Sequence, residues 1–217
     1  MEHNFWVKMW EDSDIPFHRQ EVNQFLIEHI NKLDLKSGDC ILVPLCGKSI
    51  DMLWLAKQGY KMIGVELSSI AARAFFNENN LAVKISEQKN FQHFQCQNIE
   101  IFCGDFFKLA TENLPPVKAI YDRGALIALP PDMRKKYVNH LINLTTAETK
   151  ILLEVVESPC QVQGPPFPVD SNEIKMLYGK NFTIQKFEGE LRKSISPHLM
   201  EKGYTEVTDM VYCMTKN

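Results

Sequence analysis

The sequence predicts an α/β protein built on an open, mostly parallel, doubly wound sheet. Two observations carry this prediction. Apolar runs of strand length alternate with segments whose apolar residues recur at helical spacing, which is typical of parallel strands joined by crossover helices. The chain then closes with two β-rich runs, 182–191 and 208–215, without a clear helix between them. That ending fits an antiparallel hairpin at the edge of the sheet.

The first half of the chain alternates helix and strand patterns after an aromatic-rich segment, 1–20. A helix is predicted over 21–33 and a strand over 40–45. A helical pattern then leads to Gly59, and a second apolar run covers 62–67. Ser68 is a favourable N-cap for the next helix, which ends at Asn79-Asn80.

The second half continues the alternation. Strands are predicted over 99–103, 118–121 and 151–156, the last nearly all apolar, as expected for a strand covered on both faces. Pro130-Pro131 begins a helix whose apolar residues line one face. A proline-rich loop over 158–168 and a short helix over 172–178 precede the closing β-rich runs.

Bulk properties exclude several classes of protein. With 217 residues and 45% apolar content, the chain is predicted to form a single domain over 1–217. Its formal charge is −3, and acids and bases are mixed along it, so nucleic acid is not an expected partner. No apolar stretch approaches the ~20 residues of a membrane span.

Cysteine usage and the N-terminus point to the cytoplasm. The first residues lack a basic start followed by an apolar run, so no secretory signal is expected. The six cysteines include no Cys-x-x-Cys pair, and no His pair has zinc-ligand spacing, so no metal site is predicted. Reduced thiols in a cytoplasmic chain are the preferred interpretation.

The turn after the first strand carries the strongest functional signal. Val43-Pro-Leu-Cys-Gly-Lys-Ser49 is followed, 21 positions beyond Leu45, by Glu66 at the end of the second run. Backbone amides at such a turn and an acid at the next strand tip can hold a nucleoside through its ribose hydroxyls. An ordinary connection between strand and helix is the alternative.

Neither phosphate-binding fingerprint is complete in this turn. A P-loop ending in Gly47-Lys48-Ser49 would need a glycine where Leu42 stands. The dinucleotide fingerprint needs further glycines, and Gly47 is the single one between Leu45 and Gly59. The turn therefore suits a ligand without phosphates at this position.

Two further strand ends carry candidate residues. Asp105 could reach an adenine amino group with Phe106 against the ring, but a simple turn with Phe106 in the core is as well supported. Arg123, in Asp122-Arg-Gly124, lies where open α/β sheets bind ligands. It stays protonated and so cannot act as a base, but it can hold a carboxylate or stabilise an anionic substrate. A surface ion pair between Asp122 and Arg123 is the alternative.

Two flanking segments could enclose a substrate. The loop Gly164–Pro168, with Pro165 and Pro166, is stiff and could form a substrate wall or a purely structural turn. Trp6, Trp10 and Phe17 in the segment 1–20 could form a lid over a flat heteroaromatic ligand, or pack on the sheet. The sequence contains no recognisable Ser/His/Asp set and no paired catalytic carboxylates.

With these residues in place, the chain resembles the thiopurine S-methyltransferase family, in particular its bacterial branch. The matching stretches run from about Trp6 to the end: Trp6-x-x-x-Trp10, Phe17-His18, Val43-Pro-Leu-Cys-Gly-Lys-Ser49, Met52-x-Trp54-x-Ala56-x-x-Gly59, Gly64-Val-Glu66-x-Ser68, Asp122-Arg-Gly-Ala-Leu126 and Gly164-Pro-Pro-Phe167.

The resemblance implies a fold, a cofactor and a reaction. The fold would be that of a class I S-adenosylmethionine-dependent methyltransferase, with seven strands and an antiparallel last strand. The reaction would be methyl transfer to the sulfur of aromatic and heterocyclic thiols such as thiopurines, with S-adenosylhomocysteine as product. Some bacterial members are associated with methylation of selenium and tellurium species.

The resemblance also assigns site residues. Trp10, Leu45, Glu66 and Arg123 would bind the cofactor, and Asp105 and Phe106 would form the adenine-contacting stretch. The substrate side would comprise Phe17, Arg123 and the Pro165-Pro166 loop. We expect in-line displacement driven by positioning, in which Arg123 stabilises the thiolate-like anion.

Two other functional classes remain as alternatives, and the oligomeric state is predicted as monomeric. A nicotinamide-dependent oxidoreductase would require the missing glycines. A non-catalytic S-adenosylmethionine-binding module would not require both cofactor-side and substrate-side motifs. The chain has no obvious self-association motif, which favours a monomer.

Overall fold

A computed structural model describes residues 3–160, 162–187 and 189–217. The chain divides into two compact units, residues 1–121 and 122–217, and each is described by itself. Strand β6 (Val117–Arg123) lies mainly in the first unit, and its last two residues, Asp122 and Arg123, belong to the second. Of the predicted 1–20 segment, residues 1 and 2 lie outside the described part.

The first unit contains a sheet with the strand order β3-β4-β5-β2-β1-β6. Strands β5 (Ile99–Cys103), β2 (Lys61–Glu66), β1 (Cys40–Pro44) and β6 run parallel, with Val43 opposite Gly64 and Gly64 opposite Ile101. Strands β4 (Phe91–Cys96) and β3 (Lys84–Gln88) extend this sheet as an antiparallel hairpin. The parallel arrangement brings the carboxyl ends of β1, β2 and β5 to one edge.

Local signals explain why helices follow these strands. Every residue of β1 is buried, as is β2 after Lys61, as expected for parallel strands covered on both faces. Helix α3 (Ile50–Lys57) begins after Ser49, and helix α4 (Ser69–Glu78) after Ser68. Both serine side chains accept a backbone N–H of the first helical turn, which satisfies donors that have no partner within the helix.

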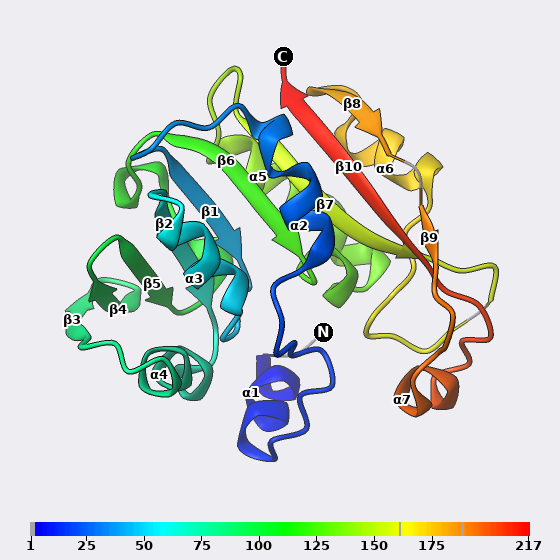
Figure 1. Ribbon diagram of the computed structural model, residues 1–217, viewed down its shortest axis with the longest axis horizontal. Helices are drawn as coiled ribbons and strands as arrows, with labels where there is room; N and C mark the ends of the chain where they lie inside the picture. Colours follow the sequence, from blue (N-terminus) through cyan, green and yellow to red (C-terminus); the bar gives the residue numbers. More distant parts are fainter. Residues whose placement is uncertain (1–2, 161, 188) are drawn as a thin grey trace. The chain divides into compact units, whose positions relative to one another are not determined.

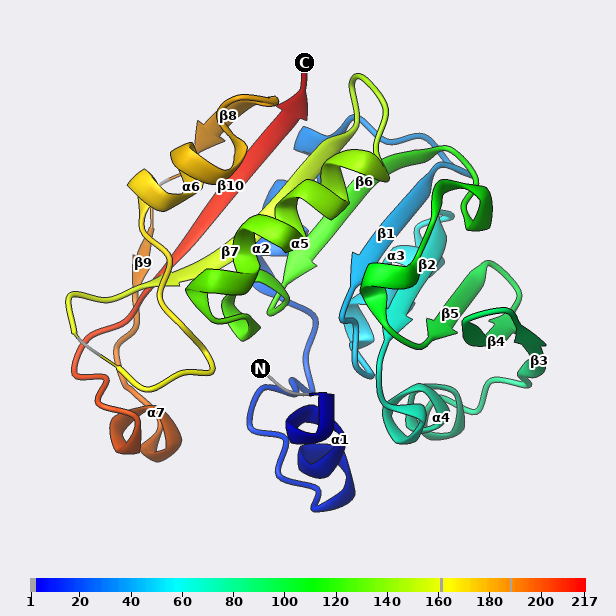
Figure 2. The same cartoon turned by 180° about the vertical axis from the view of Figure 1, so that it is seen from behind.

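The N-terminal part of the first unit is helical. Helix α1 (His3–Glu11) precedes a loop, helix α2 (Gln24–His29) and the 3₁₀ turn Ile30–Leu33. In both views α1 lies beyond the arrowhead of β1, on the side of the unit where that strand ends (Figures 1 and 2). The helix predicted over 21–33 is shorter in the structure, where it covers Gln24–His29 and is followed by a 3₁₀ turn. Part of the aromatic N-terminal segment forms helix α1, which was not predicted.

Further 3₁₀ turns follow the strands. Two of them come after β5, at Phe106–Lys108 and Thr111–Asn113, and one follows β6 in the second unit, at Leu126–Ala128. The first begins directly after the candidate residue Asp105, and the last follows shortly after Arg123. Short turns of this kind fix the backbone that leaves each strand end.

The second unit is built on antiparallel pairs. Strand β10 (Thr208–Lys216) pairs with β7 (Lys150–Glu157), with β8 (Phe182–Lys186) and with the short β9 (Glu190–Leu191). Helix α5 (Pro131–Asn143) lies across β7 in Figure 2. Helix α6 (Ser171–Tyr178) lies beside β8 and β10, and α7 (Pro197–Glu201) precedes β10.

The predicted fold class is confirmed, with more elements than expected. Parallel strands joined by helices and an antiparallel last strand are both present. The resemblance implies seven strands, whereas the described residues form ten; β3, β4 and β9 are the additions. The prediction of no helix between the closing β-rich runs was wrong, because α7 separates β9 from β10.

Two further observations concern the cysteines and the helices of the described residues. All six cysteines are free, and five of them are buried. No described helix combines the length and the apolar character that a membrane crossing requires.

Candidate functional site

The turn after β1 is held in an uncommon backbone conformation. Leu45 has φ +48°, in the left-handed region that a leucine rarely adopts. The next residues are fixed by backbone bonds, from Cys46 N to Val65 O (2.9 Å) and from Ser49 N to Cys46 O (3.1 Å). Backbone strain of this kind persists where the surroundings impose it, often at ligand sites.

Glu66 joins the two strand-to-helix turns of the first unit. Its Oε2 accepts the N–H of Gly47 (2.8 Å), and its Oε1 accepts the N–H of Ser68 (2.7 Å). The residue is 5% exposed, and burial raises the pKa of its carboxyl group, while the bonds from Ser68 and Gly47 oppose that rise. A carboxylate offers about four lone-pair sites, so these two bonds leave acceptor capacity for the hydroxyls of a sugar.

Two buried thiols lie near this carboxylate. Burial, reinforced by the charge of Glu66, raises the pKa of Cys46 well above its ordinary value and that of Cys103 to about 11. Gly64 makes room for Cys46, because a methyl group on Gly64 would lie 2.6 Å from its Sγ. Both cysteines are therefore neutral thiols and weak nucleophiles at physiological pH.

The end of β5 lies beside the end of β2. Gly104 N donates to Glu66 O (2.8 Å), which places Asp105 immediately after this contact. The Asp105 carboxylate caps a 3₁₀ turn by accepting the N–H of Phe107 (3.0 Å). Asp105 is partly exposed, whereas Phe106 is 3% exposed and contributes its ring to the core of the unit.

Aromatic side chains from the N-terminal segment meet the turn after β1. A methyl group on Gly47 would lie 3.1 Å from Cζ2 of Trp10, so the indole covers the backbone of this glycine. Phe17 packs edge-on against Trp10 and Trp6, with ring centroids 5.6 and 5.7 Å apart. Trp10 is 7% exposed and Phe17 is 41% exposed, so Phe17 presents the more accessible ring.

Lys48 has a structural partner outside the turn. Its Nζ lies 2.7 and 2.9 Å from the two carboxylate oxygens of Glu78, at the end of α4. The lysine is thus engaged by a carboxylate, as expected if the turn holds a nucleoside without phosphates there.

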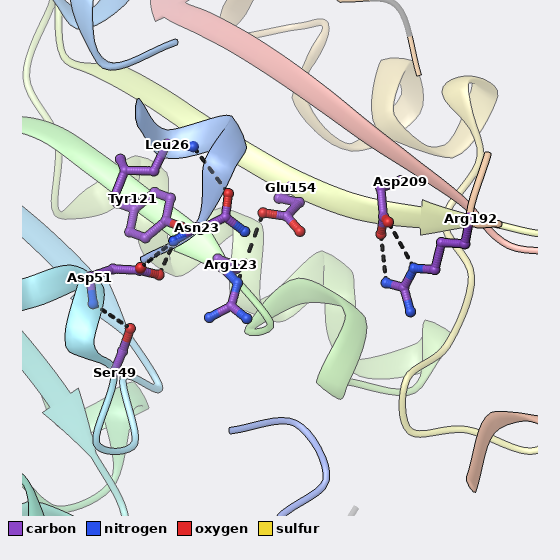
Figure 3. A network of polar contacts seen from close by, with 9 residues as sticks. All are labelled: Asn23, Leu26, Ser49, Asp51, Tyr121, Arg123, Glu154, Arg192 and Asp209. Carbon is purple, nitrogen blue, oxygen red and sulfur yellow. Dashed lines mark hydrogen bonds and ion pairs between the residues drawn. The ribbon is translucent and has the colours of Figure 1, made fainter. Parts of the chain in front are cut away.

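In the second unit, Asp122 and Arg123 have separate partners. The Asp122 carboxylate is fully buried and accepts the N–H of Leu126 (3.1 Å) and the hydroxyl of Tyr137 (2.7 Å). The Nε of Arg123 lies 3.9 Å from Oε2 of Glu154 on β7, as an ion pair (Figure 3). Asp122 thus fixes the turn that follows β6, and the guanidinium of Arg123 is near a different carboxylate.

The proline loop of the second unit is anchored at several points. Phe167 N donates to Ile127 O (2.7 Å), and the hydroxyl of Tyr204 donates to Pro166 O (2.8 Å). Arg134 on α5 is fully buried, donates to Phe167 O (3.2 Å) and pairs with Glu173 on α6 (2.6 Å). Pro165 and Pro166 therefore belong to a firmly held loop.

Sequence reasoning missed several buried or paired charged groups. They are Asp51 on α3, Arg134 on α5, and the bidentate pair of Arg192 with Asp209 on β10 (2.7 and 2.6 Å; Figure 3). An acid in the first turn of a helix whose other residues are mostly apolar is the signal that could have singled out Asp51. Within the described ranges, no group of His, Cys, Asp and Glu side chains is suited to hold a metal ion.

The predicted site residues fall into two sets. Those of the first unit are Trp10, Phe17, Leu45, Glu66, Asp105 and Phe106. Trp10 and Glu66 both contact Gly47, so the indole ring, the turn after β1 and the Glu66 carboxylate come together at this glycine. Those of the second unit are Arg123, Pro165 and Pro166.

Comparison with known proteins gives consistent results. The family model for thiopurine S-methyltransferase matches residues 1–217. Proteins of that name are similar over nearly full length: one from Marinobacter nauticus is 38% identical over 218 residues, covering 100% of both chains. One from Pseudomonas fluorescens is 40% identical over 213 residues, covering 98% of each.

Solved structures support the fold. A SAM-dependent methyltransferase from Anabaena variabilis aligns with a TM-score of 0.70 at 13% identity, covering 99% of this chain and 95% of that one. A 1,6-didemethyltoxoflavin-N1-methyltransferase from Burkholderia thailandensis, with bound S-adenosylhomocysteine, aligns with a TM-score of 0.65 at 12% identity, covering 99% and 87%. At these identities the likeness establishes the Rossmann-like class I methyltransferase fold.

Proposed function

The chain belongs to the thiopurine S-methyltransferase family, and from this premise we propose that it transfers a methyl group to the sulfur of aromatic or heterocyclic thiols. Its family makes it an S-adenosylmethionine-dependent methyltransferase. The proposal covers the methyl acceptor, the residues that act on it, the cellular compartment and the oligomeric state.

The residues of the first unit suit the nucleoside part of the cofactor. Glu66 uses its two oxygens to fix the turns at Gly47 and Ser68, and its remaining lone pairs can accept ribose hydroxyls. This position of Glu66 is the observation that carries the cofactor part of the proposal, and membership of the family supports the thiol acceptor. Asp105 is the proposed acceptor for the adenine amino group, with Phe106 as a buried wall beside it. Trp10 and the Leu45 turn are proposed to hold the rest of the cofactor.

The chemistry asks for positioning more than for proton transfer. When bound, S-adenosylmethionine supplies an activated methyl group on a positively charged sulfur. The chain has to align the acceptor sulfur with that methyl group and exclude water, and alignment can contribute about 7–11 kcal/mol in favourable cases. The ring of Phe17 and the stiff Pro165-Pro166 loop are suited to these tasks.

Arg123 is the proposed catalytic residue. A permanently charged guanidinium next to an acceptor thiol, directly or through water, favours the thiolate over the thiol. The proton of an acidic heterocyclic thiol can then pass to solvent, so no dedicated base is required. Glu154, 3.9 Å from Arg123 Nε, would orient the guanidinium. The protein's own Cys46 and Cys103 stay protonated and so do not compete with the acceptor.

The enzyme is further proposed to be a cytoplasmic monomer that forms one functional domain. Six free thiols suit a reducing compartment. The edge strand β3 is exposed along its whole length and carries Lys84 and Glu87, which discourages pairing with a second sheet. Selenium and tellurium species are proposed as further acceptors, because their reduced forms are soft nucleophiles like the thiolate.

Calorimetry and an acceptor panel test this function. S-adenosylhomocysteine should bind with one-to-one stoichiometry, and NADH should not bind. Methyl transfer should occur to 6-mercaptopurine and thiophenol, while selenide and telluride salts test the wider acceptor class. Binding of S-adenosylhomocysteine without transfer to any thiol would indicate a binding module instead, and NADH binding would support an oxidoreductase.

A further inference from the structure

The carboxylate of Asp51 connects three segments of the first unit. Asp51 lies in the first turn of α3 and is fully buried. Its Oδ1 accepts the backbone N–H of Asn23 (2.9 Å), and its Oδ2 accepts the hydroxyl of Tyr121 on β6 (3.0 Å). In Figure 3, dashed lines run from the Asp51 carboxylate to these two donors, and Ser49 lies at the start of α3.

Local structure holds Asp51 and Asn23 in place. Ser49 caps α3 by accepting the N–H of Asp51 (3.3 Å), and a carboxylate in the first turn is favoured by the helix dipole. Asn23 caps α2, because its Oδ1 accepts the N–H of Leu26 (3.0 Å). The bond between them therefore joins the starts of two helices, and breaking it removes a donor from a buried carboxylate.

The N-terminal chain is attached twice to the region that follows β1. Trp10 covers Gly47, and Asn23 is bonded to Asp51, four positions further along that region. Residues 11–22, here named the strap, lie between these two attachments. The backbone bonds that the strap makes join it to its own residues and to the end of α1. The strap is thus attached at both ends, and its Phe17 ring packs against the aromatic side chains of α1.

We infer that Asp51 is a positioning residue, whose carboxylate fixes the far end of the strap and so keeps Trp10 seated on the cofactor-binding turn. It does not touch the reacting atoms. Because Trp10 and Asp51 act on the same region, cofactor affinity and the order of the strap are coupled, and a change in one alters the other. This inference rests on the cofactor of the family and not on the identity of the methyl acceptor.

A pair of variants at position 23 tests the attachment to Asp51. Asn23 has φ −62°, which suits proline, so Asn23→Pro does not strain φ. It replaces the N–H that Asp51 accepts by a ring methylene, which breaks the bond and displaces residue 23 from the carboxylate. Asn23→Ala keeps this N–H. Both variants lose the side-chain cap, so their difference reports the attachment of residue 23 to Asp51. Full-length protein of both is titrated with S-adenosylhomocysteine by calorimetry.

A spectroscopic readout reports on the strap itself. Of the three tryptophans, Trp6 and Trp54 are replaced by Phe, so that acrylamide quenching monitors Trp10 alone. We expect Asn23→Pro to bind S-adenosylhomocysteine about tenfold more weakly than Asn23→Ala and to show greater quenching of Trp10. Asp51→Asn, which keeps an oxygen for Asn23, should stay near wild type, whereas Asp51→Ala should resemble Asn23→Pro.

Two outcomes overturn the inference. One is equal affinity and equal Trp10 quenching in Asn23→Pro and Asn23→Ala. The other is a Tyr121→Phe variant that weakens binding and exposes Trp10 as much as Asn23→Pro, because the carboxylate would then act through β6 and not through the strap. If Asp51→Ala does not fold, the two variants at position 23 still decide the question.

Discussion

Glu66 and Gly47 are joined by a 2.8 Å hydrogen bond from the glycine N–H to the Oε2 of the carboxylate. The bond links the end of β2 to the turn after β1, and the other oxygen of Glu66 accepts the N–H of Ser68. One buried side chain thus fixes two helix starts and still offers lone pairs to a ligand. Its dual role makes Glu66 the first position to test.

Replacing Glu66 by Gln should weaken cofactor binding. One carboxylate oxygen becomes an NH₂ group that faces a backbone N–H, so a bond is lost and the acceptor for ribose is weakened. We expect the dissociation constant of S-adenosylhomocysteine to rise at least about tenfold in calorimetry. Glu78→Gln, which disturbs the ion pair with Lys48 instead, is the matched control and should bind normally. Equal affinities in the two variants would remove Glu66 from the cofactor site.

A comparison of the variants Leu45→Gly and Leu45→Ala should reveal backbone strain at position 45. Both lose the leucine side chain, but only glycine adopts a φ of +48° without steric cost. The glycine variant should be the more stable by about 1 kcal/mol in urea unfolding, which is the order of cost of a left-handed conformation. If the alanine variant is as stable as the glycine variant, the turn is not strained at this position.

Arg123→Ala should separate turnover from cofactor binding. Loss of a charge that stabilises a developing anion typically lowers kcat by about 10²–10³-fold. We therefore expect such a fall with a thiopurine, while the affinity for S-adenosylhomocysteine falls far less. Arg123→Lys keeps the charge and should recover part of the rate. If turnover and cofactor affinity fall together, Arg123 is a cofactor ligand and not a catalytic residue.

Asp122 should make stability depend on pH. Burial raises its pKa to about 6, although Tyr137 and the amides of Leu126 and Ala125 lower it. The pKa of this carboxyl in the unfolded chain is about 3.9, so the folded chain binds the proton more tightly than the unfolded chain does. The contribution of Asp122 to stability therefore falls as the pH rises from about 4 to 6, and stays low above that range.

Asp122→Asn isolates this effect. The amide keeps an oxygen for the backbone and does not titrate, while Glu66 and all other groups remain in both proteins. Relative to wild type, the variant should gain stability between about pH 4 and pH 7, on the order of 2 kcal/mol in chemical denaturation. A stability difference that does not change with pH would mean that the Asp122 carboxyl titrates near its ordinary value in the folded protein.

The fold was predictable where the signal is strong and local. The nearly uninterrupted apolar residues of β1, β2 and β7 indicate buried parallel or central strands, and Ser68 caps α4 as predicted. Strand β3 was missed because every one of its residues is exposed, so no alternation of apolar and polar residues marks it. Helix α7 has only five residues, too few for helical periodicity to be recognised.

The site was predictable only in part, for a physical reason. The spacing from Leu45 to Glu66 follows from a strand–helix–strand unit and could be read from the chain. The role of Asp51 could not, because its donors lie 28 and 70 positions away in sequence. The burial of Arg134 likewise depends on acceptors 33 and 39 positions away. Whether a charged side chain is buried depends on the partners that the tertiary structure brings to it. A single sequence does not reveal those partners.

The most direct measurement of the central claim is the initial rate of methyl transfer to a matched pair of acceptors, thiophenol and phenol, with the products identified by NMR. A thiol methyltransferase that relies on Arg123 to stabilise a thiolate should form S-methyl thiophenol and leave phenol unmodified under the same conditions. Its rate should rise with pH until the thiol is fully ionised. Formation of anisole at a comparable rate, or no transfer to thiophenol by protein that binds S-adenosylhomocysteine, would contradict it.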